Sequence, residues 1–341
     1  MMSPFEFYPW QSPEAWLTDP RMNHAWLIHG QKGIGKFQFA LAGSASLLCE
    51  SPKNGLACGH CQSCHLFASW NHPDFRLLIS DMEASERGLL THLIDDPQKA
   101  TSKQILIGKV RELDDFLSIS SHRGGRRVVM IYLAEDLNIA SSNALLKSIE
   151  EPYGEVVFLL VSHSMGRVLP TIISRCRRLF LPIPPESQSI AWLTQQGIEH
   201  PQDYLAAGSG APLQAASYAS SENEPIAYWL KDFAHHLCLP QFPSLSSYVE
   251  KLENITISEW LASLYRFLLD IALVQRTGHS HYYPSLQSYY QTIAQQTNCL
   301  VISQLQKWLN EQIALNNLNI NLNPKNFALT VLQKVVQNLK K

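Results

Sequence analysis

The chain has 341 residues, of which 45% are hydrophobic and 16% are charged, and this composition excludes wholesale disorder. At roughly 100–200 residues per domain, the length predicts two or three domains with a substantial core. The formal net charge of −2 disfavours a protein that holds DNA by itself, because such proteins usually carry a basic face.

The first half of the chain alternates short apolar runs with segments of helical length. In chain order we expect a strand at 25–29, a helix at 37–48, a strand at 75–79, a helix at 102–117, a strand at 128–133, a helix at 141–151 and a strand at 156–161. Strands that alternate with helices predict a parallel sheet flanked by helices on both sides. This part of the chain is therefore predicted to be α/β.

The pattern changes after about residue 165, where prolines at 182, 184 and 185 mark a boundary. Only helices are expected beyond it. The clearest is the last, which Asn323 can cap and Pro324 can begin. Its apolar stripe consists of Phe327, Val331, Val335 and Leu339. We predict an α/β domain at 1–165, a small helical domain at 166–208 and an all-α domain at 209–341.

A phosphate-binding loop is predicted between the first strand and the first helix. Residues 30–36, Gly-Gln-Lys-Gly-Ile-Gly-Lys, fill the first seven positions of the pattern Gly-x-x-x-x-Gly-Lys. The glycines let backbone N–H groups turn toward a phosphate, and the helix N-terminus adds partial positive charge. Candidate nucleotide-binding residues are therefore Gly30, Gly33, Gly35 and Lys36. The alternative is a glycine-rich turn that only connects a strand to a helix.

Two substitutions predict that this loop does not support ATP hydrolysis. The eighth position should offer a Ser or Thr hydroxyl to Mg²⁺, but it is Phe37. The strand at 128–131 should lead into an acidic pair, but Tyr132 and Leu133 follow it. Glu135 and Asp136 come three residues late, and only a register shift would bring them into place. Whether the loop still holds a nucleotide stays open.

No apolar run approaches the roughly 20 residues that cross a bilayer. The first residues lack a basic stretch followed by an apolar one, so no secretory signal is predicted. We therefore expect a cytoplasmic protein without a membrane partner. Its seven cysteines would be reduced, and clustered cysteines in a reducing compartment favour metal binding over disulfides.

Four of these cysteines predict a structural zinc site. Cys49, Cys58, Cys61 and Cys64 have the spacing C-x₈-C-x₂-C-x₂-C, and four thiolates can close a tetrahedral shell around Zn²⁺. A closed shell leaves no position for substrate, so the metal would be structural. His60 and His65 are alternative ligands within the same segment, about 49–65. The remaining three, Cys176, Cys238 and Cys299, are isolated in sequence and expected in the core.

Two further segments resemble a known family. Residues 142–152, Ser-Asn-Ala-Leu-Leu-Lys-Ser-Ile-Glu-Glu-Pro, are similar to the Asn-Ala-Leu-Leu-Lys-x-x-Glu-Glu-Pro motif of the AAA+ subunits of bacterial DNA polymerase III clamp loaders. Residues 174–176, Ser-Arg-Cys, are similar to a second motif of that family. The cysteine insertion, residues 71–74 and residues 124–126 also fit. The resemblance covers about residues 8–182.

The resemblance implies an AAA+ P-loop domain with a zinc insertion, a helical lid domain and an all-α C-terminal collar. It implies that Arg175, positioned with the help of Ser174, reaches into the ATP site of a neighbouring subunit. Phe37, Tyr132-Leu133 and Gly210-Ala211-Pro212 depart from the hydrolysing members and match a non-hydrolysing one. The implied partners are the tau/gamma and delta subunits and, through the assembly, the sliding clamp and primer–template DNA.

Three alternatives remain open at the level of sequence. The chain could be an active motor ATPase, which Phe37 and Tyr132 argue against. It could be a zinc-dependent DNA-binding module with a vestigial nucleotide fold, which the near-neutral charge argues against. It could also be a scaffold of the assembly in which Arg175 has no catalytic role.

Overall fold

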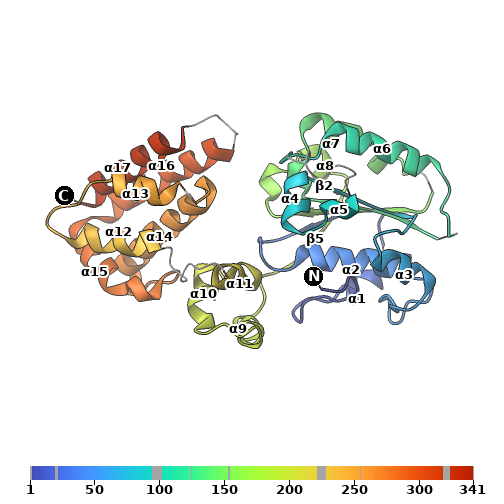
Figure 1. Cartoon of the computed structure of the whole chain (residues 1–341), viewed down its shortest axis with the longest axis horizontal. Coiled ribbons are helices and arrows are strands. Elements are labelled where there is room, and N and C mark those ends of the chain that lie inside the picture. Colours follow the sequence, from blue (N-terminus) through green and yellow to red (C-terminus); the bar gives the residue numbers. More distant parts are fainter. Residues whose placement is uncertain are drawn as a thin grey trace. The chain divides into compact units, whose positions relative to one another are not determined.

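The computed structural model describes residues 2–19, 22–93, 102–123, 125–152, 154–220, 228–253, 255–317 and 323–340. The chain forms two compact units, Met1–Gln188 and Ser189–Lys341 (Figure 1). Within these described ranges, none of the helices combines the length and the hydropathy that a membrane span requires.

A sheet of five parallel strands organises the first unit, in the order β2-β3-β4-β1-β5. The strands are β1 (Ala25–His29), β2 (Phe75–Ile79), β3 (Arg127–Tyr132), β4 (Val156–Ser162) and β5 (Arg177–Phe180). Strands β3 and β4 are buried along their whole length, as expected of central strands covered on both faces. The predicted parallel α/β fold is confirmed.

Strand β5 is the one strand of this sheet that the sequence did not predict. It has four residues at an edge of the sheet, and its side chains alternate between half-buried and exposed. Arg177 and Arg178 occupy its first half, so it lacks the continuous apolar run of a central strand. Because β5 pairs with β1, the first unit continues beyond the domain limit predicted at residue 165.

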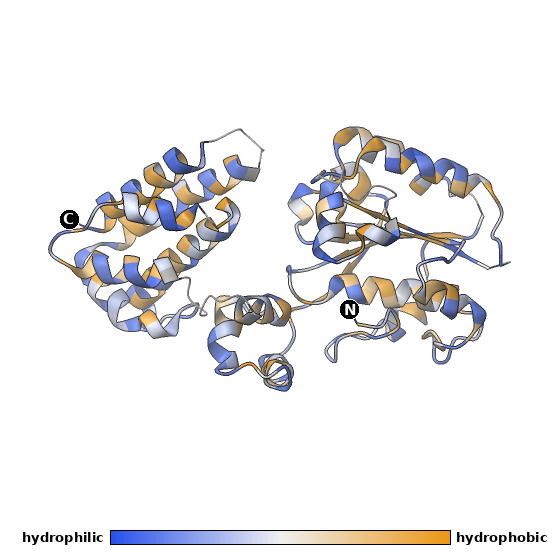
Figure 2. Ribbon diagram, viewed as in Figure 1, coloured by the Kyte–Doolittle hydropathy of each residue, from blue (hydrophilic) through white to orange (hydrophobic). Residues whose placement is uncertain are grey.

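Helices cover both faces of the sheet, with α2 on one side and α6 and α7 on the other (Figure 1). The helices of this unit are α1 (Glu14–Leu17), α2 (Lys36–Leu48), α3 (Gln62–Ala68), α4 (Asp81–Glu86), α5 (Leu90–Leu93), α6 (Ile107–Ser118), α7 (Ile139–Glu150) and α8 (Pro170–Ile173). Helix α7 begins two residues before the predicted helix, because the side chain of Asn138 caps it by accepting a hydrogen bond from the Ser141 N–H at 2.8 Å. Figure 2 shows that hydrophobic residues concentrate on the strands between these helices.

Helices alone make up the described part of the second unit. They are α9 (Glu186–Gln195), which begins at the end of the first unit, α10 (Pro201–Ala207), α11 (Pro212–Ser220), α12 (Tyr228–Cys238), α13 (Ser246–Leu252), α14 (Ile257–Thr277), α15 (Gln287–Gln296), α16 (Cys299–Asn317) and α17 (Pro324–Leu339). Helix α17 matches its prediction, since Asn323 caps it by accepting from the N–H groups of Lys325 and Asn326. Three of its stripe residues, Val331, Val335 and Leu339, are buried in the large core of this unit.

Helices α9, α10 and α11 share a small core of their own, formed by Leu193, Leu205 and Ala215. Helix α11 therefore packs with the two helices before it, although it lies beyond the limit predicted at residue 208. The division into lid and collar domains stays a prediction.

The three isolated cysteines do not share one environment. Cys176 is buried and Cys238 is half-buried, as expected of core residues. Cys299 is exposed, so its predicted place in the core was wrong. It is the first residue of α16, and the apolar sequence that follows it gave no indication that this helix end faces outward.

Candidate functional site

The predicted phosphate loop connects β1 to α2, with Gly35 as the N-cap of the helix at a φ of 98°. A Cβ at Gly35 would stand 2.4 Å from the Tyr8 ring, and a Cβ at Gly30 would stand 2.4 Å from the Leu181 carbonyl oxygen. Both positions therefore require glycine for packing as well as for backbone conformation. The N-terminal segment lies directly against the loop.

The lysine of the loop donates hydrogen bonds to backbone carbonyl groups of the same loop. Lys36 is 2% exposed, and its Nζ donates to the carbonyl oxygens of Gly30 at 2.6 Å and Gln31 at 2.5 Å. Burial lowers the pKa of Lys36 to about 7, and the carboxylate of Glu135 opposes that shift. Gly30, Gly33, Gly35 and Lys36 thus lie in one loop, with the amine satisfied inside it, and their role in nucleotide binding stays a prediction.

Phe37 and Tyr132, the two substitutions that predict an inactive site, contact each other. Their rings are 5.0 Å apart and nearly perpendicular, and they are 8% and 2% exposed. These positions should supply oxygen ligands to Mg²⁺ in a hydrolysing subunit. Because two packed aromatic rings fill them, the residues do not fit a magnesium-bound nucleotide.

Glu135 and Asp136 do not replace the missing ligands. One carboxylate oxygen of Glu135 accepts from the backbone N–H groups of His163 at 2.8 Å and Ser164 at 3.2 Å. Asp136 accepts from the hydroxyl of Ser80 at 3.2 Å, and burial followed by the charge of Glu135 raises its pKa to about 6. Strand β3 ends at Tyr132 without a register shift, so both carboxylates lie past the strand end.

Arg175 lies at the surface between α8 and β5. Its Nε and Nη2 both contact the carboxylate of Glu150, and its Nη1 donates to the carbonyl oxygen of Thr171 at 2.9 Å. Nη1 also lies 3.3 Å from the hydroxyl of Ser174, which in turn donates to the same Thr171 carbonyl at 3.0 Å. The side chain of Arg175 is 35% exposed. It borders a shallow surface pocket of about 450 Å³ that is lined by His24, Ile149, Glu150, Ser174 and Arg175.

The four predicted metal ligands converge. The Sγ atoms of Cys49, Cys58, Cys61 and Cys64 all lie within 4.8 Å of one another. Two pairs measure 3.8 Å (Cys49 to Cys61) and 4.0 Å (Cys58 to Cys64). Four sulfurs at about 2.3 Å from a tetrahedral zinc would be separated by about 3.8 Å. The residues therefore fit a four-thiolate metal site, and neither His60 nor His65 belongs to this cluster.

Backbone N–H groups point at these sulfurs. The N–H of Cys58 lies 3.3 Å from the Sγ of Cys49, and the N–H of Cys64 lies 3.4 Å from the Sγ of Cys61. The backbone of His60 lowers the pKa of the Cys58 thiol to about 6, whereas burial raises the pKa of the Cys64 thiol. Without a metal, burial thus disfavours the thiolate of Cys64, which a bound cation would stabilise.

A family model described as DNA polymerase III, delta subunit matches residues 11–184, which is 174 of the 341 residues. The chain belongs to this family. The match spans the phosphate loop, the cysteine cluster and Arg175.

Its relatives carry a more specific name. The DNA polymerase III subunit delta′ of Pseudomonas aeruginosa is 38% identical over 216 residues, which is 62% of this chain and 60% of that protein. The subunit delta′ of Escherichia coli is 34% identical over 226 residues, which is 64% and 62% of the two chains. The subunit delta′ of Bacillus subtilis is 28% identical over 191 residues, which is 56% and 52%. The chain thus matches less than two thirds of the length of each of these relatives.

A solved structure of a DNA polymerase III gamma subunit-related protein from Thermotoga maritima is also similar. It is 19% identical, with a TM-score of 0.35, and the match covers 78% of this chain and 94% of that chain.

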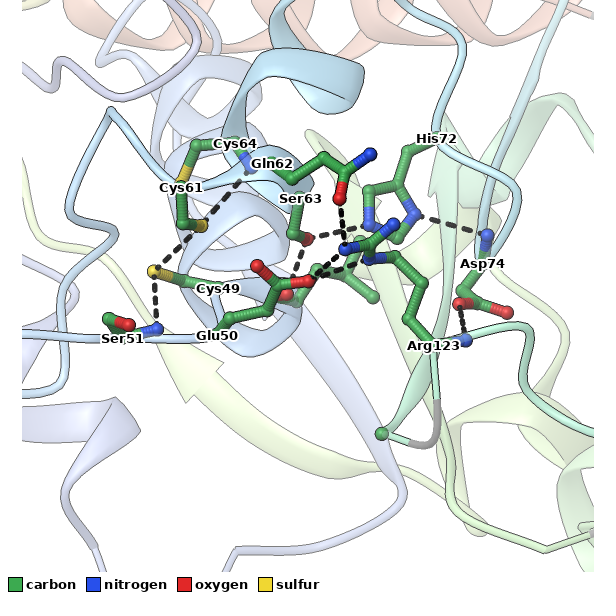
Figure 3. Close-up of polar contacts among 12 residues, drawn as sticks. Cys49, Glu50, Ser51, Cys61, Gln62, Ser63, Cys64, His72, Asp74 and Arg123 are labelled. Carbon is green, nitrogen blue, oxygen red and sulfur yellow. Dashed lines mark hydrogen bonds and ion pairs between the residues drawn. The ribbon is translucent and has the colours of Figure 1, made fainter.

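Figure 3 shows a polar network that connects the cysteine cluster of this family member to the loop before β3. Arg123 pairs with the carboxylate of Glu50 and donates to the side-chain oxygen of Gln62 at 3.1 Å. Glu50 directly follows Cys49, and Gln62 directly follows Cys61. One guanidinium therefore holds two segments of the cysteine cluster.

Buried side chains extend the same hydrogen-bond network. The carboxylate of Asp74 accepts from the N–H groups of His122 at 2.8 Å and Arg123 at 3.2 Å. The Nδ1 of His72 accepts from the N–H of Asp74 at 3.1 Å, so its Nε2 donates to the hydroxyl of Ser63 at 2.7 Å. Ser63, His72 and Asp74 are at most 3% exposed. Ser63, His72 and Asp74 thus each have a hydrogen-bond partner within this network, and the cysteine cluster is fixed to the edge of the sheet.

Sequence reasoning missed two residues beside the phosphate loop. Arg87, which follows α4, contacts both Phe37 and Tyr132, and His163, which follows β4, lies 3.2 Å from the hydroxyl of Tyr132. No motif marks either residue. A basic residue near a decayed metal site becomes a signal only once the fold has brought these segments together.

Proposed function

We propose that this chain acts as the delta-prime subunit of a bacterial DNA polymerase III clamp loader and that it does not hydrolyse ATP itself. The observation that carries the first part is the match to proteins named subunit delta′, together with membership of the delta subunit family. The observation that carries the second part is the Phe37–Tyr132 contact, which fills the positions of the magnesium ligands.

In the proposed mechanism, Arg175 acts in trans on the ATP site of a neighbouring tau/gamma subunit. A guanidinium is planar and permanently charged, so it can stabilise the charge that develops on a transferring phosphoryl group. Three features support this role: Arg175 is part-exposed, it lies beside a shallow pocket, and Ser174 and Thr171 hold one of its nitrogens. Cys176 is buried directly after it and anchors the segment.

The proposed partners follow from the same assembly. They are the tau/gamma and delta subunits in direct contact, and the sliding clamp and primer–template DNA through the complex as a whole. The all-α part of the second unit would serve as the collar that joins the subunits. The expected cytoplasmic location stays a prediction.

We further propose that the cysteine cluster holds one structural zinc ion. Cys49, Cys58, Cys61 and Cys64 would supply four sulfurs at distances that suit a tetrahedral ion. A closed shell leaves no position for a water or a substrate. The role of the metal would therefore be to hold the cluster in its fold, and Arg123 and Glu50 would orient the segments that bear the ligands.

The direct test is a mixing experiment with the purified full chain. We expect it to show no magnesium-dependent ATP hydrolysis alone, and to co-elute with a tau/gamma subunit and a delta subunit as one complex in size-exclusion chromatography. Brisk hydrolysis by the isolated chain would exclude the non-hydrolysing role. Separate elution of the three proteins at micromolar concentration would exclude the proposed place in the assembly.

Replacing Glu150 by glutamine should make Arg175 more available to the partner. The Glu150 carboxylate neutralises the guanidinium in this chain, and a triphosphate must compete with it. Exposed ion pairs contribute about 0.2–1 kcal/mol, so we expect hydrolysis at subsaturating ATP to rise about 1.4- to fivefold in the reconstituted complex. The matched control is Glu151→Gln, which changes the exposed carboxylate one residue later. Equal rates for the two variants would contradict a specific contribution of Glu150.

A further inference from the structure

A guanidinium lies beside both aromatic rings that fill the decayed metal site. The Cζ of Arg87 is 4.3 Å from the ring centroid of Phe37 and 4.3 Å from that of Tyr132. Its Nη2 donates to the hydroxyl oxygen of Tyr132 at 2.5 Å. Its Nε lies 3.4 Å from the carboxylate of Glu83, one helical turn earlier on α4. Arg87 is 29% exposed and Glu83 is 15% exposed, so the cation is largely enclosed.

Arg87 contacts the two positions that hold the metal ion in a hydrolysing subunit. The residue after the loop lysine and the residue at the end of the second buried strand are the two places from which a P-loop ATPase holds Mg²⁺. In this chain they are Phe37 and Tyr132, and the cation that contacts both is part of the chain itself. A divalent ion placed between the same two residues would be repelled by the guanidinium at close range.

The aromatic substitutions and the arginine are chemically matched. The face of an aromatic ring attracts a cation, so replacing oxygen ligands by Phe37 and Tyr132 converts a magnesium site into a site for a guanidinium. The hydroxyl of Tyr132 accepts from Arg87 and can therefore donate to the Nε2 of His163 at 3.2 Å. Burial keeps His163 neutral by lowering its pKa to about 2, so its ring can accept this bond.

The other charges that face Arg87 do not remove this preference. Glu83 pairs with it on α4, and Glu135 and Asp136 lie near Tyr132 at the end of β3. Lys36 is turned into its own loop by bonds to two carbonyl oxygens. In a hydrolysing subunit a bound Mg²⁺ brings positive charge to this pocket. In this chain the guanidinium of Arg87 supplies it.

We propose that Arg87 is an internal cation that takes the place of Mg²⁺ at the decayed site, excluding magnesium-bound nucleotide and holding the loop helix, α4 and β3 together without a ligand. Arg87 is then a third barrier to nucleotide binding, in addition to the loss of oxygen ligands at Phe37 and Tyr132. This inference deepens the proposed non-hydrolysing role and rests on it. It predicts that restoring the two missing ligands alone does not restore binding.

The test uses four full-length variants and a fluorescent, non-hydrolysable ATP analogue. The double variant Phe37→Thr with Tyr132→Asp restores the oxygen ligands, and a triple variant adds Arg87→Ala. A second triple variant adds Arg111→Ala instead, which removes an exposed arginine of α6 as a matched control. A third adds Arg87→Lys, which keeps the charge. Binding is measured by anisotropy with and without magnesium.

We expect magnesium-dependent binding at least tenfold tighter in the variant with Arg87→Ala than in the double variant. The variants with Arg111→Ala and Arg87→Lys should bind as weakly as the double variant. Equal binding by the double variant and the Arg87→Ala variant would overturn the proposal, and so would tight binding by the Arg87→Lys variant. Tight binding of magnesium-ATP by the unaltered chain would also overturn the proposal, whereas only ATP hydrolysis by that chain would overturn the non-hydrolysing role, so the two failures are distinguishable.

A second measurement does not depend on restoring the oxygen ligands. In the otherwise unaltered chain, Arg87→Ala should lower the thermal midpoint by about 5 °C, because two ring contacts and one hydrogen bond are lost together. Arg111→Ala should leave the midpoint unchanged. Equal midpoints for these two variants would show that Arg87 does not hold the site together.

Discussion

Replacing Arg175 by alanine should leave the clamp-loader complex assembled and slow ATP hydrolysis about a thousandfold at the one site that, as we propose, this residue completes. The physical reason is that no other cation of this chain is expected at the γ-phosphate. The effect is best measured in a reconstituted complex whose remaining ATP sites have been silenced in the motor subunits. DNA-stimulated hydrolysis then reports the single site, and size-exclusion chromatography reports assembly.

Two further variants separate charge and geometry from general damage. Arg178→Ala removes an exposed arginine three residues later on β5, and it should leave hydrolysis unchanged. Arg175→Lys keeps the charge but loses the planar fork, so it should recover only a small part of the rate. Hydrolysis by the Arg175→Ala complex at the unaltered rate would refute the trans role and favour a scaffold.

Removing the proposed zinc ion should have the largest effect on stability. Cys64 is the most buried of the four ligands, and its replacement by serine breaks the proposed zinc shell from the inside. If about 3 kcal/mol of the free energy of unfolding is lost, the midpoint of the first unit should fall by about 6–12 °C. Thermal melting together with metal analysis checks this, with about one zinc per chain expected in the unaltered protein.

Cys299→Ser is the matched control, because that cysteine is exposed and lies outside the cluster. It should change neither the zinc content nor the midpoint. A chelated, metal-free protein that melts at the same temperature as the loaded one would contradict a structural role. Hydrogen exchange adds a local readout, since loss of the metal should also loosen residues 119–123, which Arg123 and Asp74 join to the cluster.

The sequence predicted the parts of this fold whose signals are local. A continuous apolar run marked β4, whose residues are all buried, and an asparagine followed by a proline marked the start of α17. Strand β5 escaped prediction because half-exposed edge residues show no such run. Helix α6 begins at Ile107 and not at the expected residue 102.

The same distinction applies to the candidate sites. The cysteine cluster could be predicted from spacing because its four ligands lie within 16 residues, from Cys49 to Cys64. Arg87 could not, since it lies 50 residues after Phe37 and 45 residues before Tyr132, and only the fold brings the three together. The proposed role of Arg175 came from a resemblance, because a part-exposed arginine beside a glutamate has no chemical signal of its own.

The carbonyl oxygen of Ile34 accepts hydrogen bonds from Trp10 at 2.9 Å and Gln11 at 2.7 Å. A peptide group is planar, so pinning this oxygen also fixes the direction of the N–H of Gly35, which points the opposite way. The N-terminal segment therefore sets the orientation of one donor in the phosphate loop. Removing residues 1–12 would free that peptide plane to rotate. A protein trimmed in this way would no longer present the native loop.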